Sequence, residues 1–250
     1  METIGNAAIS HTNKSVSGCP FCILRQAKLC TGGGLENADC SDNGQGRELG
    51  ITAHTIQTRQ MIHHPQEFSE FVIVICSGQA VSSIGLPDGR RQILEILLPG
   101  DIVFWTTLFE PMSGRLIEAV TNSTYRKLKR REFHVLLSKR PDLFEMFMKL
   151  CTYNKAQSDQ LALTLGRRSA AQRIAKLILT LAERSAERGL LNDQTMRFPL
   201  RLQHVGDATG LTPIHVSRVL RELQKADIID LEARSLKIIN FAELRQIAGP

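Results

Sequence analysis

Four cysteines within the first 40 residues are the part of the chain whose residue type and spacing most directly suggest chemistry. Cys19, Cys22, Cys30 and Cys40 fall within 22 residues, whereas Cys76 and Cys151 stand alone. Clustered cysteines in a reducing compartment serve metal or redox chemistry more often than they form structural disulfides. Residues 1–48 are otherwise rich in Gly, Asn and Ser, so the cysteines are the only obvious means of ordering this arm.

The residues alone leave several uses for these cysteines open. Structural zinc sites use four cysteines, but they usually pair two CxxC knuckles, and only Cys19-x2-Cys22 is present. The same pair is also suited to a thiol–disulfide switch. A further alternative is an arm whose cysteines have no function.

The excess of basic residues concentrates near the C-terminus. The net charge of the chain is +6, and residues 167–250 carry 14 Lys or Arg against 9 Asp or Glu, a local balance of +5. This region is where a nucleic-acid footprint is expected. No apolar run approaches the roughly 18 residues of a membrane-spanning helix. The N-terminus also lacks a secretion signal, so we expect a cytoplasmic protein.

Short β-strands are predicted between residues 50 and 133. Three β-rich runs end at Gly, Pro or Asp residues, namely Phe71–Cys76, Ala80–Ile84 and Gln92–Leu98. Asp88-Gly89 between the second and third runs is a strong hairpin signal. Strands of this length and spacing predict an antiparallel barrel or roll.

The C-terminal third has the layout of a helix-turn-helix. An amphipathic helix is predicted over residues 170–188 and ends at Gly189. Arg201–Thr209, a Gly210-Leu211 turn and Thr212–Ala226 then give helix, glycine turn and helix. Thr212 is the expected N-cap and Pro213 the first helical residue. A two-stranded wing is predicted from two further segments, Ile228–Leu231 and Leu236–Ile239.

The first turns of the second helix carry the residues that would read DNA, because these turns enter the major groove in such a motif. They are Ile214, His215, Ser217, Arg218 and Arg221. Arg218 is suited to a bidentate contact with guanine, and Ser217 and His215 to a base edge or a phosphate. The alternatives are a capping role for His215 and, for Arg221, a phosphate or an internal carboxylate. The core-facing positions are Val216, Val219, Leu220 and Leu223.

A long helix is predicted to begin at Pro141 and Asp142. Its heptad seam, with alternating spacings of four and three, consists of Leu143, Phe147, Leu150, Asn154, Gln157 and Leu161. Such a seam packs either on the roll of its own chain or on a second copy of the helix. We favour a dimer helix, because proteins that read two-fold DNA sites present two recognition helices.

Several segments resemble, in the right order, the CRP/FNR family of transcription regulators, in particular its FNR and FixK branch. LQHVGDATGLTPIHVSRVLRELQKADIID, followed by LKIINFAELRQIAG, is similar to the winged helix-turn-helix of that family. FVIVICSGQAVSSIGLPDGRRQILEILLPGDIV is similar to its β-roll, and the match runs from about residue 50 to the end.

This resemblance implies an α+β fold with a defined domain order. The expected parts are an N-terminal cysteine arm (1–48), an antiparallel β-roll sensor domain of the cyclic-nucleotide-binding type (49–140), a dimerisation helix (141–166) and a winged helix-turn-helix domain (167–250). The family further implies a homodimer on a palindromic site in double-stranded DNA, with RNA polymerase as a partner. It implies no enzymatic activity.

Most residues that bind cyclic AMP in some members of the family are absent. Where those members have a Gly-Glu pair this chain has Phe104-Trp105, and where they have Arg-Ser it has Arg115-Leu116. The carboxylate for the ribose and the small hydroxyl beside the phosphate are therefore missing. We do not expect a cyclic nucleotide as effector.

The cysteine arm resembles that of the FNR-type oxygen sensors. Cys19-x2-Cys22-x7-Cys30 is similar to the arm in which those sensors hold a [4Fe–4S] cluster through thiolates. They take their fourth ligand from a cysteine of the roll, and Tyr125 occupies that position in this chain.

The fourth ligand must therefore come from another cysteine. We expect Cys40, because it lies on the same arm, with Cys76 or Cys151 as alternatives. The resulting hypothesis is a regulator whose dimerisation and DNA affinity respond to oxygen or redox state. The alternative is a regulator of the same type that is active without a cofactor, or through a thiol or zinc switch.

Two further observations limit the function. An iron–sulfur or flavin oxidoreductase would need a substrate pocket or a dinucleotide fingerprint, and the sequence has no G-x-G-x-x-G or nucleophile motif. FNR-like proteins carry a glutamate three residues before a Ser-Arg pair, whereas Ile214 precedes Ser217-Arg218 here. Isoleucine can contact a thymine methyl but cannot accept a hydrogen bond, so the usual half-site is not expected.

Overall fold

Apolar runs that end at Gly, Pro and Asp residues fold into two four-stranded antiparallel sheets, which together form a roll. The computed structural model describes residues 22–31, 41–42, 49–64, 70–103 and 114–249. The strand orders are β3-β10-β5-β8 and β4-β9-β6-β7. The strands are β3 (Thr52–Ile56), β4 (Met61–His63), β5 (Phe71–Ser77), β6 (Ala80–Gly85), β7 (Arg91–Leu97), β8 (Ile102–Val103), β9 (Leu116–Ala119) and β10 (Ser123–Lys129).

The three predicted strands are confirmed, each within one residue at either end. The hairpin at Asp88-Gly89 is also confirmed, because β6 and β7 pair in antiparallel register. Gly89 has a φ of +85°, a conformation that glycine adopts without steric cost.

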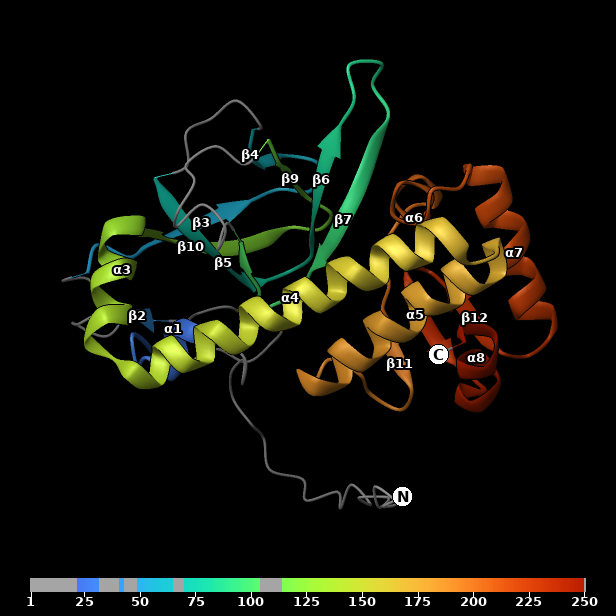
Figure 1. Cartoon of the computed structure of the whole chain (residues 1–250). Coiled ribbons are helices and arrows are strands. Elements are labelled where there is room, and N and C mark those ends of the chain that lie inside the picture. The colour runs from blue at the N-terminus through green and yellow to red at the C-terminus, as the bar shows by residue number, and fades with distance from the viewer. Residues whose placement is uncertain (1–21, 32–40, 43–48, 65–69, 104–113, 250) are drawn as a thin grey trace.

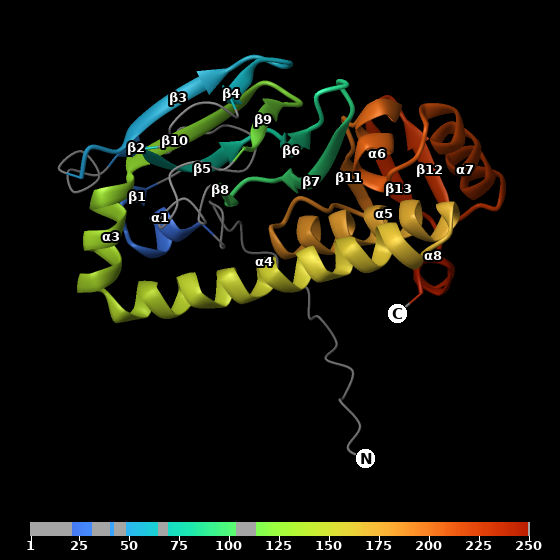
Figure 2. The ribbon, with the colours of Figure 1, turned by 45° about the horizontal axis from the view of Figure 1, so that its top comes forward.

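A first helical layer closes one end of the roll and buries the start of the described chain. It consists of α1 (Ile23–Gln26), α3 (Arg130–Lys139) and the N-terminal half of α4 (Pro141–Arg167). Phe133 of α3 and Phe147 of α4 meet edge to face, with ring centroids 5.7 Å apart. Ile23 and Leu24 of α1 are buried in the same apolar cluster. Figure 2 shows α1 between the roll and α4. The short strands β1 (Cys30–Thr31) and β2 (Ser41–Asp42) pair with each other.

The C-terminal part is a helical domain with a small sheet. It contains α5 (Ala170–Glu187), β11 (Thr195–Arg197), α6 (Leu202–Thr209), α7 (Pro213–Lys225), β12 (Ile229–Glu232), β13 (Ser235–Ile238) and α8 (Phe241–Ala248). The helix, turn and helix are confirmed, and so is the wing. The wing has a third strand, β11, which the sequence did not predict.

The turn between α6 and α7 is tight enough to require glycine at two positions. Gly210 ends α6 in the left-handed conformation, with a φ of +67°. Gly206 lies one turn earlier, where an added Cβ would be 2.5 Å from the carbonyl oxygen of Leu211. The backbone of Leu211 closes the turn, since its N–H donates to the carbonyl of Gly206 at 3.1 Å.

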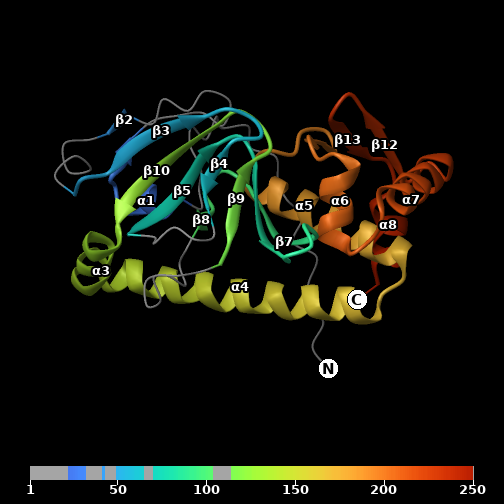
Figure 3. The same cartoon turned by 90° about the horizontal axis from the view of Figure 1, so that it is seen from above.

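Helix α4 runs alongside both the roll and the C-terminal domain (Figures 2 and 3). Figure 1 shows the roll beside the first part of α4, and α6 and α7 near its other end. None of the described helices is long and apolar enough to cross a bilayer.

A buried ion cluster joins the roll to α5. The carboxylate of Asp101, in the turn before β8, forms ion pairs with the guanidinium groups of Arg184 and Arg188, at N···O distances of 2.5 Å and 2.6 Å. Arg184 also donates to the carbonyl of Ile96 at 2.8 Å, and Arg188 to that of Pro99 at 3.2 Å. All three charged residues are at most 8% exposed, so these ion pairs and hydrogen bonds replace much of the water that the charged groups lose on burial.

Glu95 of β7 faces this cluster from the interior of the roll. It pairs with Ser82 across the sheet and lies two residues before Leu97, which is part of the interior apolar cluster. Burial raises the pKa of Glu95 to about 7, and the carboxylate of Asp101 adds to the rise. The opposing cations are Arg184, Arg115 and Arg188.

A second ion cluster joins the β6–β7 hairpin to α6. Arg91 of β7 donates to Glu118 of β9 at 2.6 Å and to Asp207 of α6 at 2.8 Å. Gln92 adds a hydrogen bond to the carbonyl of Ala208 at 3.2 Å. The first helix of the helix-turn-helix therefore packs directly on the roll.

The tight turn gives a prediction about stability. Gly206→Ala is expected to lower the free energy of unfolding by about 1–3 kcal/mol, because the new Cβ overpacks the turn. Gly166→Ala is the matched control, since a Cβ at this helical position meets nothing within 4 Å. The control should be neutral or stabilising by up to about 1 kcal/mol. Urea unfolding followed by circular dichroism measures both, and equal effects would contradict the close approach at Gly206.

The raised pKa of Glu95 gives a prediction about pH. Glu95 holds its proton more tightly in the folded chain than in the unfolded chain, where its pKa is near 4.5. Its contribution to stability is therefore complete below about pH 4.5 and is lost as the pH rises through about 7. Between about pH 5 and pH 8 the wild type should lose roughly 2 kcal/mol of unfolding free energy relative to Glu95→Gln. Parallel pH profiles of the two proteins would show that Glu95 is already ionised at pH 5.

Candidate nucleic-acid interface

Helix α7 is amphipathic, and its buried side is the one that the sequence predicts. Val216, Val219, Leu220 and Leu223 are all at most 4% exposed and belong to the core of the C-terminal domain. Thr212 caps the helix by accepting from the N–H of His215 at 3.4 Å, and Pro213 is its first residue. The core fixes the rotation of α7, so its other side faces outward.

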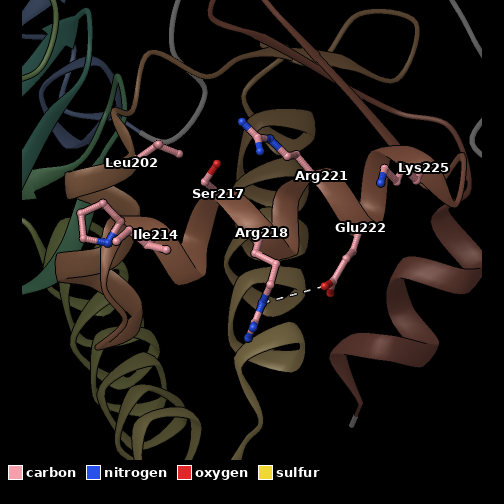
Figure 4. Close-up of a pocket in the computed structure, with 8 residues that line it drawn as sticks. Leu202, Ile214, Ser217, Arg218, Arg221, Glu222 and Lys225 are labelled. Atoms are coloured by element: carbon pink, nitrogen blue, oxygen red, sulfur yellow. Dashed lines mark ion pairs between the residues drawn. The ribbon is translucent and has the colours of Figure 1, made fainter.

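The outward side of α7 carries four of the five residues that the sequence selects for DNA contact. Ile214 is 82% exposed, the Arg218 side chain is 64% exposed, Arg221 is exposed and Ser217 is half-buried. They follow one another at positions i, i+3, i+4 and i+7, which places them on one helix face. Figure 4 shows the labelled side chains along the outer face of α7.

The fifth residue, His215, is turned toward the cap. Its Nδ1 lies 3.2 Å from the hydroxyl of Thr212, whose oxygen also accepts from the backbone of His215. This is the alternative role that the sequence analysis allowed for His215. The side chain is exposed, so the contact with Thr212 orients it without burying it.

A shallow groove of about 580 Å³ follows this face. It is lined by Leu202, Pro213, Ile214, Ser217, Arg218, Arg221, Glu222 and Lys225. Four of these residues were not among the predicted contact residues, namely Leu202, Pro213, Glu222 and Lys225. Lys225 could have been found, because it lies one turn after Arg221 on the same face. Leu202 could not, because it comes from the start of α6 and reaches the groove only through the turn.

The groove carries more positive than negative charge. Arg218, Arg221 and Lys225 face one carboxylate, Glu222, which lies 3.9 Å from Arg218 (Figure 4). An exposed pair at this distance is weak, so Arg218 exchanges it easily for another acceptor. The arginine and lysine side chains are suited to contact phosphates or base edges of DNA. The Ser217 hydroxyl and the apolar end of the groove at Ile214 are suited to contact base edges.

The predicted cysteine ligands lie only partly within the described chain. Cys19 and Cys40 lie outside it, and Cys30 is described by its backbone, which pairs with Asp42. Cys22 precedes α1 and is 7% exposed, within the apolar cluster that contains Phe147 of α4. In the part of the chain that the structure describes, no three metal-ligating side chains come together.

The two alternative fourth ligands, on α4 and β5, are both half-buried. Cys151 of α4 packs against the apolar cluster that contains Cys22, and burial raises the pKa of the Cys151 thiol, which disfavours the thiolate. Cys76 lies near the end of β5, and its thiol donates a hydrogen bond to the carbonyl of Val74 at 3.7 Å. Tyr125, at the position where FNR-type sensors have their fourth ligand, is buried inside the roll and stacks on His54.

The interior of the roll retains one of the family's nucleotide-binding residues. Arg115 is half-buried, and its guanidinium lies 3.5 Å from the hydroxyl of Ser82 and within the electrostatic reach of Glu95. Phe104 and Trp105 lie outside the described residues. Arg115 thus already has an internal carboxylate nearby.

The seam on α4 divides into two halves. Leu143 and Phe147 are buried in the apolar cluster of their own chain, and Leu150 packs against it. Asn154, Gln157 and Leu161 are half-buried. Other large apolar residues of α4 are exposed by 40–51%, namely Phe144, Met148, Tyr153 and Leu163. The first half of the seam thus packs on its own chain, and pairing with a second copy stays a prediction.

Comparisons with known proteins agree with both parts of the fold. Residues 53–140 match the model of the cyclic nucleotide-binding domain, and residues 172–247 match that of the Crp-like helix-turn-helix domain. The nitrogen fixation regulation protein FixK of Rhizobium meliloti is 30% identical over 167 residues, covering 66% of this chain and 72% of that protein. The fumarate and nitrate reduction regulatory protein of Vibrio cholerae is 27% identical over 195 residues, 78% of this chain and 77% of that protein.

A solved structure agrees as well. FixK2 of Bradyrhizobium japonicum is 25% identical and has a TM-score of 0.73, covering 80% of this chain and 98% of that chain. The roll, the helix-turn-helix with its wing and these relatives lead to one conclusion: the chain belongs to the CRP/FNR family of DNA-binding transcription regulators.

Proposed function

We propose that this regulator binds a palindromic DNA site as a homodimer and responds to oxygen or redox state through a [4Fe–4S] cluster on its cysteine arm. The observation that carries the DNA part is the outer face of α7, where exposed cations and an apolar end line one groove. The observation that supports the second part is the position of Cys22, which anchors the arm beside α4.

Arg218 is the proposed base reader. Its guanidinium is exposed, is held only loosely by Glu222 and projects from the second turn of α7. A guanidinium matches the two acceptors of guanine in the major groove, a pairing that contributes about 1–3 kcal/mol of discrimination. Arg221 and Lys225, further along the same face, are placed to contact phosphates.

Helix α4 is the proposed dimer element. Its exposed apolar side chains, Phe144 and Met148 among them, lie on a helix that borders both the roll and the C-terminal domain. Pairing would bury this surface and would place two copies of α7 on two half-sites. RNA polymerase is the proposed partner once the dimer is bound near a promoter.

The proposed cluster ligands are Cys19, Cys22, Cys30 and Cys40. Soft thiolates are the ligands that iron–sulfur clusters require, and a bound cluster would supply oxygen-sensitive chemistry to the arm. Cys22 fits this role in position, because it lies at the start of α1. Its backbone carbonyl accepts hydrogen bonds from the N–H groups of Arg25 and Gln26. A change at Cys22 therefore acts directly on α1, which packs on α4.

Cys40 remains the proposed fourth ligand. The pairing of β1 with β2 sets the backbone of Cys30 beside Asp42, which follows Cys40 by two residues in the sequence. Cys151 is disfavoured by the raised pKa of its thiol. We assign no cyclic nucleotide to the roll, because Phe104-Trp105 and Leu116 stand where the family's cyclic-AMP-binding members have the residues that hold the ribose and the phosphate.

A second candidate function is a regulator of the same family that acts without a cofactor. The burial of the Cys22 side chain in an apolar cluster favours it, since a buried cysteine often serves only as a small apolar residue. The two functions share the DNA-binding part and differ only in the arm.

Arg218→Ala tests the DNA part. Loss of the bidentate contact should weaken binding to the specific site about 5- to 150-fold per half-site, and binding to random DNA much less. Lys139→Ala is the matched control, because it removes one exposed cation at the end of α3, near the far end of α4 from α7 (Figure 1). Fluorescence anisotropy measures both affinities, and size-exclusion chromatography checks that dimerisation is intact. Unchanged footprints with Arg218→Ala would show that α7 docks differently.

Anaerobic purification tests the arm. We expect a brown protein that contains iron and sulfide, bleaches in air and loses operator affinity in step with its colour. Cys40→Ser should abolish the iron content, whereas Cys76→Ser and Cys151→Ser should retain it. A colourless, iron-free protein that binds DNA equally with and without air would instead establish the cofactor-free regulator.

A further inference from the structure

Ile214 is the most exposed large apolar side chain in the described part of the chain, at 82%. It belongs to the first turn of α7, whose inner positions are already filled by Val216 and Val219. The other apolar residues that line the groove are Pro213, which precedes Ile214 in the sequence, and Leu202, which lies at the same end as Ile214 (Figure 4). An isoleucine so exposed has its apolar surface available to whatever occupies the groove.

The neighbours of Ile214 define what that occupant is. Ser217 and Arg218 follow at i+3 and i+4, so Ile214 shares its face with the proposed base reader. The hydroxyl of Thr212 and the ring of His215 pair with each other at the cap, 3.2 Å apart. The first turn therefore meets DNA mainly through the apolar surface of Ile214.

The major groove offers one apolar group that distinguishes a base, the C5-methyl of thymine. An isoleucine offers neither a donor nor an acceptor. The amino group of cytosine, pressed against it, would lose water without gaining a hydrogen bond. Thymine is thus favoured by contact, and cytosine is disfavoured by desolvation.

We propose that Ile214 determines operator specificity by reading the methyl group of a thymine. This inference rests on the proposed DNA-binding function and adds a base identity to it. Ile214 and Arg218 are four residues apart, about 6 Å along the helix axis. This distance spans about two base pairs. The thymine should therefore lie within about two base pairs of the guanine that depends on Arg218.

The test removes the methyl group and leaves every hydrogen-bonding group of the base in place. Binding sites are first selected from a random DNA library with the wild-type protein, and each thymine of the half-site is then replaced by deoxyuridine. At one position per half-site we expect the affinity to fall about 4-fold, the effect of one buried methyl group. Ile214→Ala should bind thymine and deoxyuridine at that position equally, whereas Ile214→Val should still prefer thymine.

A second variant tests the same position by introducing a preference for a different base. Ile214→Glu supplies an acceptor for the amino group of cytosine, so selection with this variant should replace the thymine by cytosine. Arg218→Ala provides the comparison, because it should change the preference at the guanine and leave the methyl effect in place.

The outcomes separate this inference from the proposed function. One outcome is that the wild type selects a sequence that depends on Arg218, but its affinity is unchanged by deoxyuridine at every position. The proposed role of Ile214 is then wrong, whereas the proposed DNA-binding function is retained. The same holds if Ile214→Ala keeps the full methyl effect. If the wild type selects no sequence at all, the proposed function itself fails.

Discussion

The arrangement of this regulator depends on one buried carboxylate, Asp101, that is shared by two arginines, Arg184 of α5 and Arg188 at the C-terminal cap of that helix. Removing Asp101, Arg184 and Arg188 from water is costly, and the cost is offset only because each guanidinium also donates to a backbone carbonyl of the roll. The hydrogen bonds and ion pairs that these three residues share leave little freedom for α5. Since α6 and α7 pack on α5, the position of the outer face of α7 depends on this point.

The β6–β7 hairpin provides the second connection between roll and reader. Arg91 joins Glu118 of the roll to Asp207 of α6, so the first helix of the helix-turn-helix is in contact with the strand that also carries Glu95. Packed or ion-paired side chains therefore connect the roll to the helix-turn-helix, and α1 to α4. Two polar junctions and one long helix thus connect the roll to the helix-turn-helix domain.

The sequence predicted the features that depend on local chemistry. Asp88-Gly89 and the Thr212-Pro213 cap have conformations set by the residues themselves, and the period of Val216 to Leu223 fixes which side of α7 is buried. The two polar junctions were not predicted, because Asp101 and Arg184 are 83 residues apart and only the fold brings them together. Strand β11 has three residues and no distinctive pattern. Leu143 and Phe147 fit a dimer seam equally well, and only the presence of α1 and α3 shows that their own chain covers them.

The length of α4 has a mechanical consequence. Its 27 residues extend about 40 Å, and no proline interrupts it after the first residue, so it behaves as a stiff rod. One end lies beside Cys22 and α1, and the other lies near the helix-turn-helix. A tilt of about 5° at the first end moves the second by about 3.5 Å, close to the rise of one base pair. A rod of this length would act as a lever, in which a displacement too small to disrupt the core at one end becomes a shift of about one base pair at the other.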